Sequence, residues 1–223
     1  MNFSYRSLQS ITLRSLVTVG LATALTNTHA ASLVDNFDDF QYVLSTSQPA
    51  SGPLVIGSSL PGTVTRTMSI TSTGQNDSGE MFSEAGILSI SSVQSTSTSA
   101  SVIYQFDGID FAGFADAWLI DVTGIDLGAT FRLIANDTSE FQFDPISQTG
   151  RYIALFSAFS NPGVFGQLNR FELRVSTSND TDLTLSALSA DRTHGSVPEP
   201  GTLALLLTGL LLATKLNIKP SRT

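Results

Sequence analysis

The chain contains no cysteine and only two histidines among its 223 residues. The absence of cysteine excludes a disulfide framework, a thiolate zinc site and a cysteine nucleophile. His29 and His194 both lie outside residues 31–193, where we predict the folded domain. That domain therefore lacks the usual general base of a Ser-His-Asp arrangement, and its stability must come from packing or from hard metal ions.

Basic residues are also scarce. Between residues 31 and 196, six arginines and no lysine stand against eighteen aspartates and glutamates, a formal balance of six minus eighteen, or −12. Such a charge repels nucleic acid and anionic lipid, so we predict no nucleic-acid partner. A cation or a neutral polymer such as polysaccharide is compatible with the charge, and so is a surface that is acidic only for solubility.

The N-terminus has the three parts of a secretory signal peptide. Residues 1–14 are polar and include two arginines, residues 16–25 are apolar, and the small residues Ala30 and Ala31 follow. We predict a signal peptide helix over residues 1–30, cut by signal peptidase after Ala30 or Ala31, which implies export through the Sec translocon. A membrane anchor is the alternative, but about ten apolar residues span only ~15 Å as a helix.

The C-terminus combines a proline motif, a leucine-rich stretch and a basic end. We predict a transmembrane helix over residues 202–218, which needs Lys215 to extend its ammonium group to the interface, and a cytoplasmic basic tail over residues 215–223. Two prolines exclude a helix across the motif itself. The motif is Val197, Pro198, Glu199, Pro200 and Gly201, and the basic residues are Lys215, Lys219 and Arg222.

This three-part tail resembles the PEP-CTERM sorting signal of Gram-negative-type bacteria. The resemblance covers only about the last 27 residues of the chain. It implies recognition by an exosortase-type transpeptidase, processing near the Pro-Glu-Pro, transient residence in the inner membrane, and delivery to the cell surface or extracellular matrix. A plain C-terminal membrane tail is the alternative. The predicted organisation is thus a signal peptide (1–30), a folded domain (31–193), and a linker with the sorting signal (194–223).

The folded domain alternates apolar and polar residues with a period of two, which predicts an all-β fold. Residues 170–176 are the clearest case, with Phe171, Leu173 and Val175 expected to face inward. In residues 63–70, Val64, Met68 and Ile70 share one face and hydroxyl residues the other. Many short strands between turn residues predict an antiparallel β-sandwich of jelly-roll type, with a closed barrel as the alternative.

Two local features refine this prediction. In residues 183–190 the apolar phase moves from odd to even positions, which predicts a β-bulge near Ser186 or Ala187. The serine- and threonine-rich tract 91–99 is predicted as a long exposed hairpin loop.

The acidic segment 35–40 opens the mature domain, and its apolar residues Phe37 and Phe40 are expected to anchor the first strand. Together with residues 181–185, it resembles the first and last strands of jelly-roll carbohydrate-binding modules, which implies that the two lie together and hold a structural calcium ion. The predicted oxygen ligands are Asp35, Asp38, Asp39 and Asp191, with solvated strand-end carboxylates as the alternative. No other cofactor is predicted.

Trp118 is the only tryptophan. An exposed indole would be a stacking platform for a sugar ring, but the neighbouring pattern predicts instead that Trp118 is buried between sheets or in a groove. Tyr104 and Tyr152 are predicted to point inward with their hydroxyls at a rim.

No paired-carboxylate, phosphate-loop or nucleophile motif is present, so we predict a non-enzymatic protein. Its predicted role is structural or adhesive, at the cell surface or in the matrix, and linked to exopolysaccharide. The alternatives are a carbohydrate-binding module and a carboxylate-dependent polysaccharide hydrolase or lyase.

Overall fold

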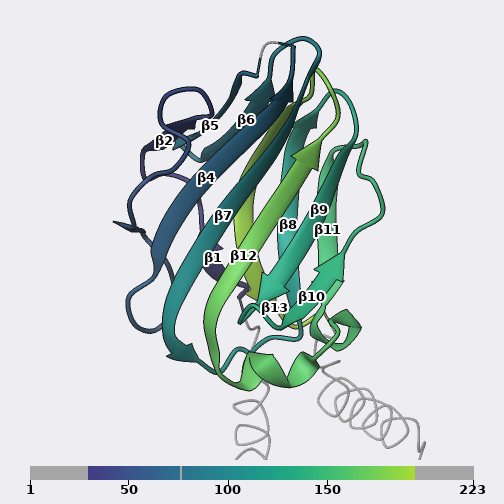
Figure 1. Cartoon of the computed structure of the whole chain (residues 1–223). Helices are drawn as coiled ribbons and strands as arrows, with labels where there is room; N and C mark the ends of the chain where they lie inside the picture. The colour runs from purple at the N-terminus through teal and green to yellow at the C-terminus, as the bar shows by residue number, and fades with distance from the viewer. Residues whose placement is uncertain (1–29, 76, 194–223) are drawn as a thin grey trace, which may run out of the picture. The chain divides into compact units, whose positions relative to one another are not determined.

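The computed structural model describes residues 30–75 and 77–193, which form two antiparallel sheets packed face to face (Figure 1). The predicted all-β sandwich is therefore confirmed. The predicted signal peptide, sorting motif, transmembrane helix and basic tail lie outside the described residues. Nowhere in the two described stretches is there a helix with the length and apolarity needed to cross a bilayer.

The first sheet has the strand order β11-β8-β13-β6-β5-β2, with β1 paired to β13 beside this path. Its strands are β1 (Ser32–Asp35), β2 (Gln41–Leu44), β5 (Gly79–Glu84), β6 (Ile87–Ser92), β8 (Ala117–Ile125), β11 (Gly150–Leu155) and β13 (Asp182–Asp191).

The second sheet has the order β10-β9-β12-β7-β4-β3. Its strands are β3 (Leu54–Val55), β4 (Thr65–Gly74), β7 (Thr96–Ile109), β9 (Ala129–Ala135), β10 (Ser139–Gln142) and β12 (Leu168–Thr177). Two short 3₁₀ helices, η1 (Phe156–Ala158) and η2 (Pro162–Gly166), stand between β11 and β12.

Alternation along the strands builds the core between the sheets. On β12 the side chains of Phe171, Leu173 and Val175 are fully buried, as predicted. On β13 the register against β8 shifts between Leu185 and Ala187, and this bulge keeps Leu188 inside with Leu185. The predicted bulge is confirmed.

The predicted hairpin loop over residues 91–99 is wrong in its extent. Strand β6 continues to Ser92 and β7 begins at Thr96, so only a tight turn remains, in which Ser95 has a φ of 61°. Thr96 and Thr98 point inward and are buried. β-branched threonine favours strands, and the low complexity of the tract concealed this alternation.

The first and last strands of the domain pair with each other, but not through the predicted segments 35–40 and 181–185. Strand β1 pairs with the end of β13, from Ser32 opposite Ala190 to Asp35 opposite Leu188. The beginning of β13, which includes residues 182–185, pairs with β6 instead. Two strands thus share one edge of β13 in succession.

Candidate functional site

Trp118 lies in the core and is fully shielded from solvent. Its indole stacks on Phe171 with ring centroids 4.2 Å apart and contacts Phe111 at 4.9 Å. Its neighbours on the adjacent strands are Ala154 and Ala190, whose small side chains leave room for the indole. The predicted burial is confirmed, and the alternative role as a platform for a sugar ring is wrong.

The four carboxylates predicted to bind calcium have separate partners. Asp35 pairs with Arg66, Asp38 accepts from the Asn36 amide, and Oδ2 of Asp39 accepts from the backbone N–H of Gly57 at 2.9 Å. Oδ1 of Asp191 accepts from the backbone of the next residue. Within the described stretches, no three histidine, cysteine or acidic side chains lie close enough to hold a metal ion.

Arg66 is fully buried and lies at the centre of a polar cluster between the sheets. Its Nη1 donates to Oδ2 of Asp35 at 2.7 Å, its Nε to Oε1 of Gln41 at 3.0 Å, and its Nη2 to the carbonyl oxygen of Asp39 at 2.6 Å. The hydroxyl of Tyr104 also donates to Oδ2 of Asp35, at 3.0 Å. The hydroxyl of Tyr104 is therefore in the core and not at a rim, because the ion pair gives it a partner there.

Burial shifts the pKa values of two groups in this cluster. Burial raises the pKa of the Asp35 carboxyl, and the charge of Arg66 and three hydrogen bonds offset only part of that effect. Burial and the adjacent Asp35 carboxylate raise the pKa of Tyr104 well above its usual value. Each charged or hydroxyl group has a partner, so we assign the cluster a structural role.

The outer face of the first sheet carries a row of aromatic residues that point away from the core. On β2 and β5, Tyr42 and Phe82 are half-buried, whereas the residues on either side of them are buried and point inward. Tyr42 lies directly opposite Phe82 in the ladder, and Phe82 lies opposite Ser89 of β6. Phe40, two residues before Tyr42, leaves 63% of its surface in solvent. We call Phe40, Tyr42 and Phe82 the aromatic row.

A groove of about 400 Å³ lies beside the aromatic row, between β2 and the segment that leads to β3. Nε2 of Gln41 donates to Oγ of Ser51 at 2.8 Å and to the carbonyl oxygen of Gly52 at 2.9 Å, which ties the two walls together. Nε of Arg66 donates to Oε1 of the same amide, so the buried cluster fixes the position of Gln41 in the lining of the groove. The lining residues are Phe40, Gln41, Tyr42, Gln48, Ser51, Gly52, Pro53 and Leu54.

Two carboxylates flank the aromatic row. Glu80 and Glu84 lie two residues to either side of Phe82 on β5 and therefore share its face. Within residues 30–75 and 77–193, no hydrogen bond or ion pair of either carboxylate is found. The aromatic row offers apolar surface, and the carboxylates of Glu80 and Glu84 beside it can accept hydrogen bonds. This combination suits a ligand with apolar faces and hydroxyl donors.

The sequence analysis did not identify this site and assigned Phe40 an anchoring role. Phe37 does anchor β1 and is fully buried, but Phe40 is exposed. The alternation of Phe40, Tyr42 and Leu44 was present in the sequence. Only the strand order shows that this face of β2 is not covered by the second sheet.

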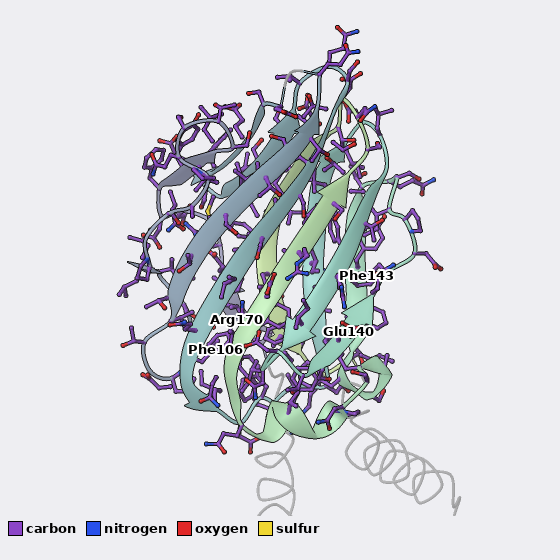
Figure 2. All side chains as sticks on the ribbon, in the orientation of Figure 1. Phe106, Glu140, Phe143 and Arg170 are labelled. Carbon is purple, nitrogen blue, oxygen red and sulfur yellow. The ribbon has the colours of Figure 1, made fainter. Side chains whose placement is uncertain are left out.

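The outer face of the second sheet is different in character. Glu172 on β12 accepts hydrogen bonds from Arg174, Arg170 and Ser101, at distances from 2.7 to 3.0 Å. Burial raises its pKa, but these hydrogen bonds outweigh burial and hold the pKa below its usual value. Arg170 also pairs with Asp137, and Figure 2 labels Arg170 and Glu140 on this face. The charged groups in these contacts are therefore paired with one another.

No protein-family model and no curated protein matches the chain. Solved structures with a distant likeness include the family 11 carbohydrate-binding module of the cellulosomal cellulase Lic26A-Cel5E of Clostridium thermocellum, at 10% identity over 74% of this chain and 97% of that one, with a TM-score of 0.34. TmCBM61, solved with β-1,4-galactotriose, is 10% identical over 70% and 91%, with a TM-score of 0.32. PfGH50B is 11% identical over 72% of this chain but 23% of its own, with a TM-score of 0.37. Likeness at this level does not transfer a function, so the function must be argued from the chain's own residues.

Proposed function

We propose that the chain is an exported, non-enzymatic surface or matrix protein whose β-sandwich, of jelly-roll type, binds a neutral polysaccharide along the aromatic row. The exposed ring of Phe40, beside the Tyr42 ring and the groove, is the observation that carries this proposal. A solvated phenylalanine directly before strand β2 costs hydrophobic free energy, which a stacked ligand would recover. Sugar rings present flat C–H faces that suit such a surface.

Charge selects a neutral polymer over an anionic one. The domain carries a formal charge of −12 between residues 31 and 196, and Glu80 and Glu84 add negative charge beside Phe82. A polymer of uronic acids would be repelled. The hydroxyls of a neutral sugar would instead donate to these carboxylates, and such charge-assisted hydrogen bonds are the stronger kind.

Export and sorting complete the proposal. The signal peptide ending near Ala30, the Val197–Gly201 motif and the basic tail support delivery to the surface through an exosortase-type transpeptidase. A polysaccharide-binding domain released there would be held in the matrix by its ligand. A structural calcium ion at Asp35, Asp38, Asp39 and Asp191 stays a prediction.

Two measurements on protein recovered from the producing cells test the proposal. Affinity electrophoresis in gels that contain a neutral mixed-linkage glucan, a neutral galactan or polygalacturonate should show retardation by a neutral polymer and none by polygalacturonate. Retardation by none of the neutral polymers would refute the binding role.

The intact mass of the same protein tests export and sorting. A mass that corresponds to a chain from about Ala31 to between Pro198 and Gly201 supports processing at both ends. Recovery from the inner membrane with the tail retained would contradict sorting, whatever the binding result.

A further inference from the structure

A second aromatic hollow lies at the opposite edge of the first sheet, between the loop after β10 and the strand β11. It has a volume of about 330 Å³ and belongs to no feature described above. Its lining residues are Phe143, Asp144, Pro145, Ile146, Ser147, Gln148 and Tyr152. Figure 2 labels Phe143 at this edge of the sandwich.

The walls of this hollow are fixed by backbone pairing and by ring contacts. Ile146 and Ala129 exchange two backbone hydrogen bonds of 2.7 and 2.9 Å, which hold the loop against β9. The rings of Phe143 and Tyr152 meet edge to face, with centroids 5.8 Å apart and an angle of 80°. The hydroxyl of Tyr152 donates to the carbonyl oxygen of Gln148 at 2.7 Å. The two aromatic walls are therefore held in place before any ligand binds.

Polar side chains at the mouth of the hollow remain available to a ligand. Asp144, Ser147 and Gln148 are exposed. In the part of the chain that the structure describes, their side chains make no hydrogen bond and no ion pair. Aromatic walls with a carboxylate, a hydroxyl and an amide at the mouth present the same chemistry as the aromatic row, and none of the lining residues is basic.

The two aromatic sites stand far apart. Strands β2 and β11 are the two ends of the order β11-β8-β13-β6-β5-β2 (Figure 1). Five steps between neighbouring strands separate them, a distance of roughly 24 Å. They therefore lie at opposite edges of the first sheet.

We infer that the domain is bivalent and cross-links neutral polysaccharide, with one polymer segment on the aromatic row and a second in the Phe143–Tyr152 hollow. This inference rests on the proposed function and adds to it a mechanical role in the matrix. Two sites on one rigid sheet join two polymer segments, so many domains would connect many chains into a network.

Calorimetry and light scattering on the recovered protein test this inference. A soluble neutral oligosaccharide of about four sugars should bind at two sites per chain. The corresponding long polymer should form large scattering assemblies at intermediate protein concentration, and these should disperse when excess protein gives each polymer segment its own domain.

Variants separate the two sites. Asp144→Ala combined with Gln148→Ala changes only exposed side chains and should leave one oligosaccharide site and abolish assembly, while Gln142→Ala, at another exposed glutamine on β10, should change neither. Phe40→Ala should also leave one site and abolish assembly. Sedimentation without polymer must show a monomer, because a dimer with one site per chain would also join polymers.

Each outcome bears on one claim. A single site per chain that disappears in Phe40→Ala would overturn bivalence and leave the proposed function intact. Two sites in the Asp144→Ala and Gln148→Ala variant would likewise overturn the second site. Failure of every neutral polymer and oligosaccharide to bind would overturn the proposed function itself.

Discussion

The guanidinium of Arg66 and the carboxylate of Asp35 form an ion pair of 2.7 Å, and the two side chains retain 0% and 1% of their surface in solvent. Asp35 ends β1 in the first sheet and Arg66 lies on β4 in the second, so the pair links the two sheets through the core. It also anchors the first strand of the domain. A guanidinium thus neutralises the carboxylate for which the sequence predicted a calcium ion.

Replacing Arg66 by methionine should destabilise the domain by about 3–5 kcal/mol, because the carboxylate of Asp35 would stay buried without its partner. Urea unfolding monitored by circular dichroism gives the free energy of unfolding. The double variant Asp35→Leu with Arg66→Met should lose less than Arg66→Met alone, since it leaves no uncompensated charge.

The matched control for this prediction is Arg132→Met. Arg132 pairs with Glu140 on the surface, where 40% and 53% of the two side chains remain exposed. Its loss should cost about 0–1 kcal/mol. Equal effects of the two single variants would contradict the view that the buried pair holds the sheets together.

Glu172 should make the domain less stable in acid. Its pKa is lowered from 4.5 because hydrogen bonds from Arg174, Ser101 and Arg170 outweigh the effect of burial. The unfolded state therefore binds the proton more readily, and the stability contributed by Glu172 is present above about pH 4.5 and lost as the pH falls through the lower folded pKa. Glu172→Gln should remove this part of the acid dependence.

The difference between wild type and Glu172→Gln isolates this effect from that of Asp35. The folded pKa of Asp35 is raised, so its contribution to stability has the opposite pH dependence: it is fully present below about pH 3.8 and lost as the pH rises through the folded pKa. The free energy of unfolding of each protein, measured from pH 3 to 7, gives the two pH dependences to be compared. A Glu172→Gln variant with the same pH slope as wild type would refute the assignment.

The strands could be predicted because their faces follow from neighbouring residues alone. The alternation of Phe171, Leu173 and Val175 and the phase change near Ser186 are local signals, and both proved right. The same parity places Arg66 on the face of Met68, so its burial could also have been predicted from residues 63–70.

The partners of those residues could not be predicted in the same way. Asp35 meets Arg66 only after β1 and β4 have joined different sheets, 31 positions apart in the sequence. Whether Phe40 is an anchor or an exposed ring depends on which face the second sheet covers. The candidate sites therefore required the strand order, which a period of two does not contain.

The burial of Trp118 has a spectroscopic consequence. As the only tryptophan, it should emit at short wavelength and resist quenching by iodide, because the rings of Phe111, Phe156, Phe165 and Phe171 surround it. Saturating neutral oligosaccharide should leave its emission maximum unchanged. A shift in emission and protection from quenching on binding would place the ligand against Trp118 and contradict the structure.

Truncating Trp118 to alanine should cost about 3–5 kcal/mol of stability through the cavity that it leaves. Trp118→Phe keeps much of the volume and should cost less while leaving polysaccharide affinity unchanged. Urea unfolding and affinity electrophoresis on the same preparation separate the two effects.

The aromatic row predicts which exposed side chain matters for binding. Phe40 and Val55 each leave 63% of their surface in solvent, but only Phe40 lines the groove, whereas Val55 lies on β3 in the other sheet. Phe40→Ala should weaken the affinity of its site for a neutral oligosaccharide by about 30-fold, which corresponds to a hot spot of about 2 kcal/mol. Val55→Ala should leave that affinity unchanged, because Val55 does not line the groove although it is as exposed as Phe40.

Since neither side chain packs in the core, both variants should keep the unfolding midpoint of the wild type. Calorimetry with each variant decides the matter: equal losses of affinity in the two would mean that exposed apolar surface in general, and not the aromatic row, attracts the ligand.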